Sequence, residues 1–417
     1  MDDFNEKLYL MKQERNRGRW QGVIITVSVM AVLFLFGFLW HKLYVVFSNG
    51  IRTGLFSDSY KSRIITDDVD QKLGYIEKII DTYYLEDVDE DAMKEGIYKG
   101  VISNIGDDYA EYYTKEEFSD MMSDTEGVFE GIGALLQIDQ NTGALVIVKP
   151  LKDSPAERAG ILENDIIIEV DGEDIVGQDL NVVVSKIRGK KGSKVKLGVV
   201  REGEKDTLYF DIKRDTVESV TVEYEMLEDK IGYLMISEFS DNTSGQFKKA
   251  LNSLDKDGME GLIIDLRGNP GGNVDTAVEI ADVMLPEGTV VYTIDKNNEK
   301  VEYESDANCY EIPCVILINQ YTASAAEILS GAMQDYGKAE LLGTTTYGKG
   351  IVQTVLSLGD GTGLKMTSAK YYTPNGINIH GVGIKPDIEL EFDAERYEEK
   401  QEDNQKEGAI QYLKDNK

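Results

Sequence analysis

The sequence is poor in the residues that most often bind metals or carry protons in active sites. It contains two histidines, His41 and His380, and two cysteines, Cys309 and Cys314. No cluster of His, Cys, Asp and Glu has the spacing of a metal site, so we predict neither a metal nor a cofactor. His41 borders an apolar run, which leaves His380 as the one histidine for a Ser-His-Asp triad.

Basic residues are also scarce. The chain has 44 Lys and Arg against 76 Asp and Glu, a net charge of −32. Residues 1–19 hold five basic and four acidic residues, so residues 20–417 carry a net charge of −33. Phosphate backbones are bound by clustered positive charge, and so acidic a chain is not expected to bind nucleic acid.

One uncharged apolar run is long enough to cross a bilayer. Residues 20–40, from Trp20 to Trp40, are 21 residues without a charge. That length spans the hydrocarbon layer as a helix, and tryptophans at both ends suit the two interfaces. The rival interpretation is a removable signal peptide, but no small-residue cleavage site follows the run. We predict a single-pass anchor in the cell membrane.

The basic residues of the N-terminal segment predict the orientation of this anchor. They gather next to the membrane and include Arg15, Arg17 and Arg19. Positive charge favours the cytoplasmic side, so the N-terminus is expected inside and the rest of the chain outside. In that compartment Cys309 and Cys314 have a spacing that suits either a short disulfide loop or two free thiols.

Composition and periodicity divide the chain into seven segments and predict a mixed α/β and α+β multidomain fold. Helical spacing of apolar residues marks residues 66–122, and short β-branched runs broken by glycines mark residues 123–214. Strands and helices then alternate in an α/β core. The segments are an N-terminus 1–19, an anchor 20–40, a linker 41–65, a helical region 66–122, a β-rich domain 123–214, the core 215–392 and an acidic, loosely ordered tail 393–417.

A serine and a lysine in the core suggest a nucleophile and its base. Ser324 opens an amphipathic segment, and Lys349 follows 25 residues later between Gly348 and Gly350. A serine at a helix start and a lysine returned to it by the next strand would form a dyad. The lysine must be neutral, so burial has to lower its pKa. The alternative is that Ser324 caps a helix and Lys349 is a surface lysine.

Five further segments of the chain occur in a characteristic order: Gly261 to Gly272 (GLIIDLRGNPGG), Thr322 to Glu327 (TASAAE), Gly343 to Gln353, Thr373 to Gly376 (TPNG) and Gly381 to Asp387 (GVGIKPD). In order and spacing these motifs resemble those of the C-terminal processing peptidases, also called tail-specific proteases. The resemblance covers roughly residues 67–390 and implies a serine endopeptidase with a PDZ domain and a core of repeated β-β-α type. It also implies Ser324 as nucleophile, Lys349 as general base and Gln353 as the residue that positions the lysine.

The resemblance assigns further binding residues. The N–H groups of Gly271 and Ala325 would form the oxyanion hole. Residues 123–214 resemble a PDZ domain, in which Gly131, Ile132 and Gly133 would bind the terminal carboxylate of a peptide. The partners implied are proteins or peptides with free, apolar C-termini, and a homodimer through residues 66–122.

Two other functions fit parts of the sequence. One is a non-catalytic scaffold that holds peptides through the PDZ domain, and the other is a Ser-His hydrolase that uses His380. Intact Ser324, Lys349 and Gln353 favour the peptidase.

Overall fold

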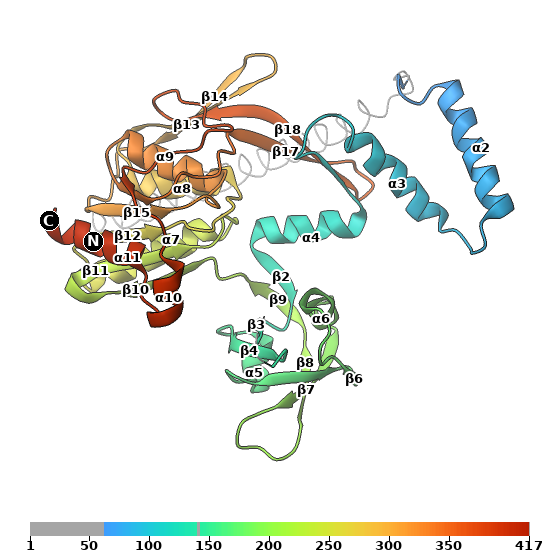
Figure 1. The fold of residues 1–417 in the computed structure, drawn as a ribbon, viewed down its shortest axis with the longest axis horizontal. Coiled ribbons are helices and arrows are strands. Elements are labelled where there is room, and N and C mark those ends of the chain that lie inside the picture. Colours follow the sequence, from blue (N-terminus) through green and yellow to red (C-terminus); the bar gives the residue numbers. More distant parts are fainter. Residues whose placement is uncertain (1–61, 140–141, 417) are drawn as a thin grey trace, which may run out of the picture. The chain divides into compact units, whose positions relative to one another are not determined.

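The computed structural model describes residues 62–139 and 142–416, and the chain divides into two compact units, residues 1–92 and 93–417 (Figure 1). The predicted N-terminus, the anchor 20–40 and most of the linker 41–65 lie outside the described residues. Within the ranges that are described, no helix combines the length and apolarity needed to cross a membrane.

The region 66–122 forms helices, as its apolar spacing predicts. They are α2 (Asp67–Tyr83), α3 (Glu90–Ile102) and α4 (Lys115–Glu126). A short strand, β1 (Glu111–Tyr113), precedes α4 and was not expected. Apolar residues of α2 point to solvent, with Ile76 44% and Tyr83 81% exposed.

The core is built on a six-stranded sheet in which all strands but the first run parallel. The two central strands of this sheet are buried along their whole length, which explains the apolar runs in the sequence, whereas the two edge strands are partly exposed. The order is β10 (Val222–Met226), β11 (Ile231–Ile236), β12 (Gly261–Asp265), β15 (Cys314–Ile318), β16 (Glu340–Gly343) and β19 (Ile388–Glu389). A 3-10 turn, η1 (Glu228–Lys230), joins β10 to β11.

Helices cover the two faces of this sheet. On one face Leu262, Ile264 and Ile316 belong to the same buried cluster as α7 (Thr243–Lys256), α8 (Val274–Met284) and α9 (Ala325–Asp335). The helices and buried strands predicted for residues 231–333 are therefore confirmed.

The tail after Asp393, expected to be partly disordered or loosely helical, is mostly helical and packs on the core. Residues 394–415 form α10 (Ala394–Lys400) and α11 (Asn404–Asp415), shown in dark red in Figure 1. Ala409 and Leu413 of α11 are buried against Ile263 and Val315 on the second face of the sheet. The tail looks polar because only these few side chains of α11 enter the core.

A second sheet carries the segment after Lys349. Its central strand, β18, pairs with β1, β13 and β17, and a bulge lies between Val352 and Gln353 of β17. The strands are β13 (Gly288–Asp295), β14 (Lys300–Ser305), β17 (Ile351–Ser357) and β18 (Gly363–Tyr372).

The β-rich domain has its own apolar core, which includes Ile147, Ile167 and Leu197. A two-stranded ribbon of β2 (Val128–Gly131) and β9 (Asp215–Glu218) closes its ends. Between them lie β3 (Ala134–Ile138), β4 (Leu145–Pro150), α5 (Pro155–Ala159), β5 (Ile166–Val170), β6 (Glu173–Asp174), α6 (Leu180–Ile187), β7 (Lys194–Val200) and β8 (Leu208–Lys213).

The two cysteines are free thiols in this structure. Cys314 begins β15 and is buried, and burial raises the pKa of its thiol to about 12. Cys309 donates to the carbonyl of Met284 at 3.1 Å.

Candidate active site

Ser324 lies at the start of α9 in an unusual backbone conformation. Its φ is 54° and its ψ is −118°, so a non-glycine residue has a positive φ. Such strain persists only where the surroundings impose it, and it is frequent at functional sites. The side chain is half-buried, and the Ser324 N–H donates to Glu327 Oε2 at 2.9 Å.

Glu327 links Ser324 to the segment that carries Lys349. Its side chain is fully buried. Oε2 accepts the N–H groups of both Ser324 and Lys349, each at 2.9 Å. Oε1 accepts the Thr346 hydroxyl at 2.5 Å and the Gly348 N–H at 2.8 Å. One carboxylate therefore brings together the two residues predicted to form the dyad.

The Lys349 side chain is half-buried, and its pKa is lowered from the ordinary value of 10.5. Burial is the largest cause, the positive charge of Lys365 is the second, and Glu327 opposes both. The shift has the sign that a lysine base requires.

The ammonium group of Lys349 lies over an aromatic ring. Its Nζ is 4.8 Å from the ring centroid of Tyr109, in the segment before β1. Within the described ranges, Lys349 Nζ makes no hydrogen bond to the Ser324 hydroxyl. The face of the ring attracts the charged form of the amine.

Gln353 does not bind the lysine in this structure. It lies on β17 opposite Thr367 of β18. Its Nε2 is buried without a hydrogen-bond partner in the part of the chain that is described. An unpaired buried amide is costly, so this side chain has a donor available for another arrangement of the site.

The loop of residues 267–272, named here the oxyanion loop after the role predicted for it, packs against Ser324. Gly271 has φ 99°, and a Cβ there would lie 2.7 Å from the Cβ of Ser324. However, its N–H donates to Asn269 Oδ1 at 2.8 Å, so the expectation that it faces an oxyanion is not met here. Ala325 begins α9, where N–H groups lack intrahelical partners.

The predicted carboxylate site of the β-rich domain borders a cavity of about 330 Å³. Gly131, Ile132 and Gly133 line it together with apolar residues of β3 and α6. The Ile132 carbonyl accepts from Ala156 and the Gly133 carbonyl from Leu151. The backbone N–H groups of Ile132 and Gly133 have no backbone partner among the residues described.

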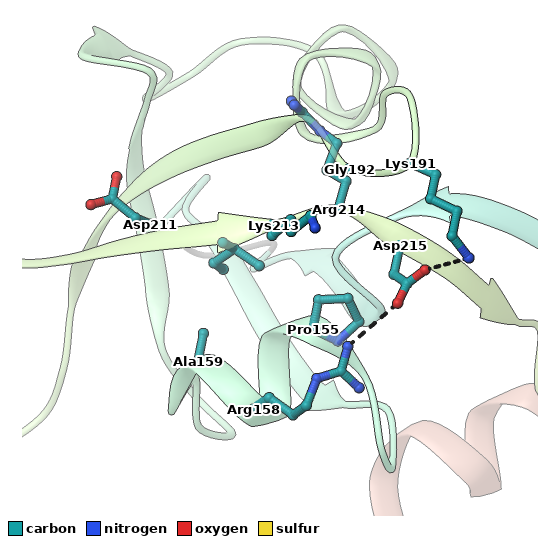
Figure 2. Close-up of a pocket in the computed structure, with 10 residues that line it drawn as sticks. Pro155, Arg158, Ala159, Lys191, Gly192, Asp211, Lys213, Arg214 and Asp215 are labelled. Atoms are coloured by element: carbon teal, nitrogen blue, oxygen red, sulfur yellow. Dashed lines mark ion pairs between the residues drawn. The ribbon is translucent and has the colours of Figure 1, made fainter.

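A larger cavity of the same domain has no part in this chemistry. Its volume is about 570 Å³, and Asp215 pairs there with Lys191 at 2.8 Å and Arg158 at 3.7 Å (Figure 2). None of its lining residues belongs to the predicted sites.

His380 is exposed to solvent, although its backbone packs against Gly350. Its side chain makes no hydrogen bond or ion pair to a described residue. The structure therefore gives the Ser-His alternative no support.

Sequence reasoning missed one contact and one residue of the site. Glu327, expected to be structural, salt-bridged or capping near its helix start and given no catalytic role, does cap α9, but its bonds to Gly348 and Lys349 were not foreseen. Tyr109 gave no signal, because it lies 240 positions before Lys349.

Replacing Glu327 with glutamine tests the role of its carboxylate. Glu327→Gln must turn an amide NH₂ toward at least one N–H donor, that of Gly348 or those of Ser324 and Lys349, so we expect turnover to fall at least about tenfold and stability to fall by about 1–3 kcal/mol. Asp335→Asn is the control, because it makes the same change at the other end of α9, where Oδ2 accepts the Asn375 N–H. Turnover and thermal melting would be measured together, and equal turnover in both variants would contradict the role.

Comparisons with known proteins identify the family. The sequence profile of peptidase family S41 matches residues 230–390, and that of a PDZ domain matches residues 146–201. Carboxy-terminal processing protease CtpB of Bacillus subtilis (strain 168) is 39% identical over 329 residues, 77% of this chain and 68% of that protein. CtpA of the same organism is 38% identical over 335 residues, 80% and 71%.

A probable CtpA-like serine protease of Staphylococcus haemolyticus is 38% identical over 324 residues, 77% of this chain and 64% of that protein. The chain thus spans slightly less than two thirds of the length of such staphylococcal relatives. The chain belongs to peptidase family S41, the family of the carboxy-terminal processing serine proteases, and it contains a PDZ domain.

Proposed function

We propose that the chain is a serine endopeptidase that hydrolyses peptide bonds with Ser324 and Lys349. The observation that carries this proposal is the shared Glu327 oxygen, which accepts the N–H groups of both residues. Two further observations support the proposal: Ser324 has a strained backbone at the start of a helix, and the pKa of Lys349 is lowered. Family membership supports the same reaction class.

In the reaction, Lys349 leaves the Tyr109 ring and accepts the proton of the Ser324 hydroxyl. The serine oxygen attacks the peptide carbonyl, and the protonated lysine then gives the proton to the leaving amine. Gln353, whose Nε2 has no partner among the described residues, lies on the strand that follows Lys349 and is the residue assigned to position it.

Backbone donors near Ser324 would stabilise the oxyanion that forms. The Ala325 N–H lies in the first turn of α9 and suits that task. The Gly271 N–H joins it once the bond to Asn269 Oδ1 opens. The active arrangement therefore differs from this structure in two local contacts, at Lys349 and at Gly271.

We also propose that the PDZ domain binds the free C-terminus of a substrate. Two features of the cavity beside Gly131 to Gly133 support this proposal. Backbone N–H groups are available there, and Leu136, Leu180 and Val184 form apolar walls. Such a groove adds a peptide as an extended strand and favours an apolar terminal residue.

The predicted anchor at residues 20–40 is proposed to hold the catalytic region outside the cell membrane. Its support is the uncharged run and the basic residues before it. Cell fractionation tests the anchor by comparing the full chain with a variant that consists of residues 43–417. If the full chain is found only in the soluble fraction, the proposed anchor is wrong.

A homodimer through residues 66–122 is proposed as well. The exposed apolar face of α2, with Leu73, Ile76 and Ile79, supports a second copy as the partner. Light scattering should show a dimer that Ile76→Asp converts to a monomer, whereas a monomeric wild type would contradict the proposal.

The dyad makes a prediction about two variants and about pH. Ser324→Ala and Lys349→Arg should each retain less than about 1% of peptide turnover, because arginine stays charged and cannot accept the serine proton. Turnover of the wild type should rise with pH as Lys349 deprotonates, at values below the ordinary 10.5.

Lys385→Arg is the matched control, since Lys385 is exposed and away from the site. If Lys349→Arg is as active as this control, the lysine is not the base. If Ser324→Ala keeps full turnover, the proposed nucleophile is wrong. A folded wild type without any turnover would favour the non-catalytic scaffold.

The PDZ proposal predicts that a peptide with a free carboxylate binds and is cleaved better than the same peptide with a terminal amide. Gly133→Val should weaken binding, because φ is 73° and a Cβ would lie 2.5 Å from Ser154 Cβ. Gly172→Val is the control, since Gly172 also has a positive φ but lies outside the cavity. Calorimetric titration that finds equal affinity for acid and amide would show that this domain does not read chain ends.

A further inference from the structure

Arg267, the first residue of the oxyanion loop, connects this loop to the C-terminal helices. Its guanidinium pairs with Asp265 at the end of β12, at 2.6 Å. It also donates to both oxygens of Asp403, at 2.7 and 3.1 Å, and to Gln405 Oε1 at 3.0 Å. The paired fork of donors fixes the orientation as well as the position of the arginine.

The contacts continue from Arg267 to the nucleophile. The next residue, Gly268, donates to Asn319 Oδ1 at 3.0 Å. Asn269 is fully buried, and its carbonyl accepts the N–H of Ala323 at 2.9 Å. Ala323 directly precedes Ser324. The oxyanion loop is thus joined to the tail at its start and to the serine segment at its middle.

A cavity of about 1000 Å³ borders the loop on the side that faces the tail, lined by Arg267, Tyr321, Thr345, Phe392 and Asp403 among others. Among the described residues, Arg267 connects the loop to the tail through its ion pair with Asp403 and its hydrogen bond to Gln405. Its guanidinium also lies 6.0 Å from the ring centroid of Phe392, the residue just before the tail.

We propose that Asp403 and Gln405 are positioning residues for catalysis, because they hold Arg267 and through it the oxyanion loop against Ser324. This proposal rests on the proposed peptidase function. It assigns a part in that function to residues 403–405, which lie outside the five motifs of the core. Neither residue touches the reacting atoms. They keep the N–H donors of the loop at the correct position relative to Ser324. A displacement of such a group by about 1 Å lowers the rate by up to about a hundredfold.

Asp403→Asn separates this role from the capping of α11. In the wild type Asp403 Oδ1 accepts the N–H groups of Gln405 and Lys406, each at 3.0 Å. Asparagine caps helices as well as aspartate does. Its NH₂ would then face the Arg267 donor that Oδ2 accepts, so the variant keeps the cap and the Oδ1 contact but loses the Oδ2 hydrogen bond and the ion pair with the arginine.

The matched control is Glu225→Gln. It breaks the pair of Lys406 with Glu225, 2.8 Å long, which also fastens α11 to the core but makes no contact with the oxyanion loop. We expect kcat on a PDZ-independent ester to fall about tenfold or more in Asp403→Asn, with KM and peptide affinity unchanged, and to stay at the wild-type value in Glu225→Gln. The double variant Arg267→Lys/Asp403→Asn should have a kcat only slightly lower than that of the less active single variant, because the two residues act through the same contact.

Hydrogen exchange gives a readout that does not depend on turnover. The amides of Gly268, Asn269 and Gly271, which are hydrogen-bonded here, should exchange faster in Asp403→Asn than in Glu225→Gln or wild type. Unchanged exchange, or equal kcat in the two variants, would overturn the proposal. A wild type without Ser324-dependent turnover would instead refute the peptidase function, while the exchange rates would still decide whether the tail holds the loop.

Discussion

The site depends on the buried carboxylate of Glu327, which forms no ion pair with any of the described residues. Glu327 is taken out of water, and four donors replace its hydration: three backbone N–H groups and one hydroxyl. Each bond to an ionised acceptor is stronger than a neutral one, and the start of α9 adds a favourable dipole. Removing the carboxylate would leave these donors unpaired in the interior. The backbone at Ser324 and the backbone at Lys349 are therefore both held in place by the same side chain.

The residues proposed for catalysis lie close together in this structure but do not make the contacts that the reaction requires. Lys349 stacks on Tyr109, Gln353 has an unpaired amide among the described residues, and the Gly271 N–H is bonded to its own loop. All three can change without unfolding an element, because they involve side chains and one amide. The strands and helices that carry them are already in place, so the remaining rearrangement is local.

The fold was predictable where local pattern and burial agree. Strands β12 and β15 are buried throughout and mostly apolar because helices cover both faces, and α9 begins next to the serine that the sequence indicates. The order of α11 was not predictable, because Ala409 and Leu413 are too few to show a helical stripe in a charged segment. The Tyr109 contact depends on the pairing of β1 with β18, a long-range register that no local signal encodes.

The packing of α11 against the sheet has a consequence for biosynthesis. Until residues 404–415 have been synthesised, the sheet face that holds Ile263, Val315 and Leu317 lacks the cover that α11 provides. A product terminated before residue 404 would therefore present an apolar surface to chaperones and degrading enzymes.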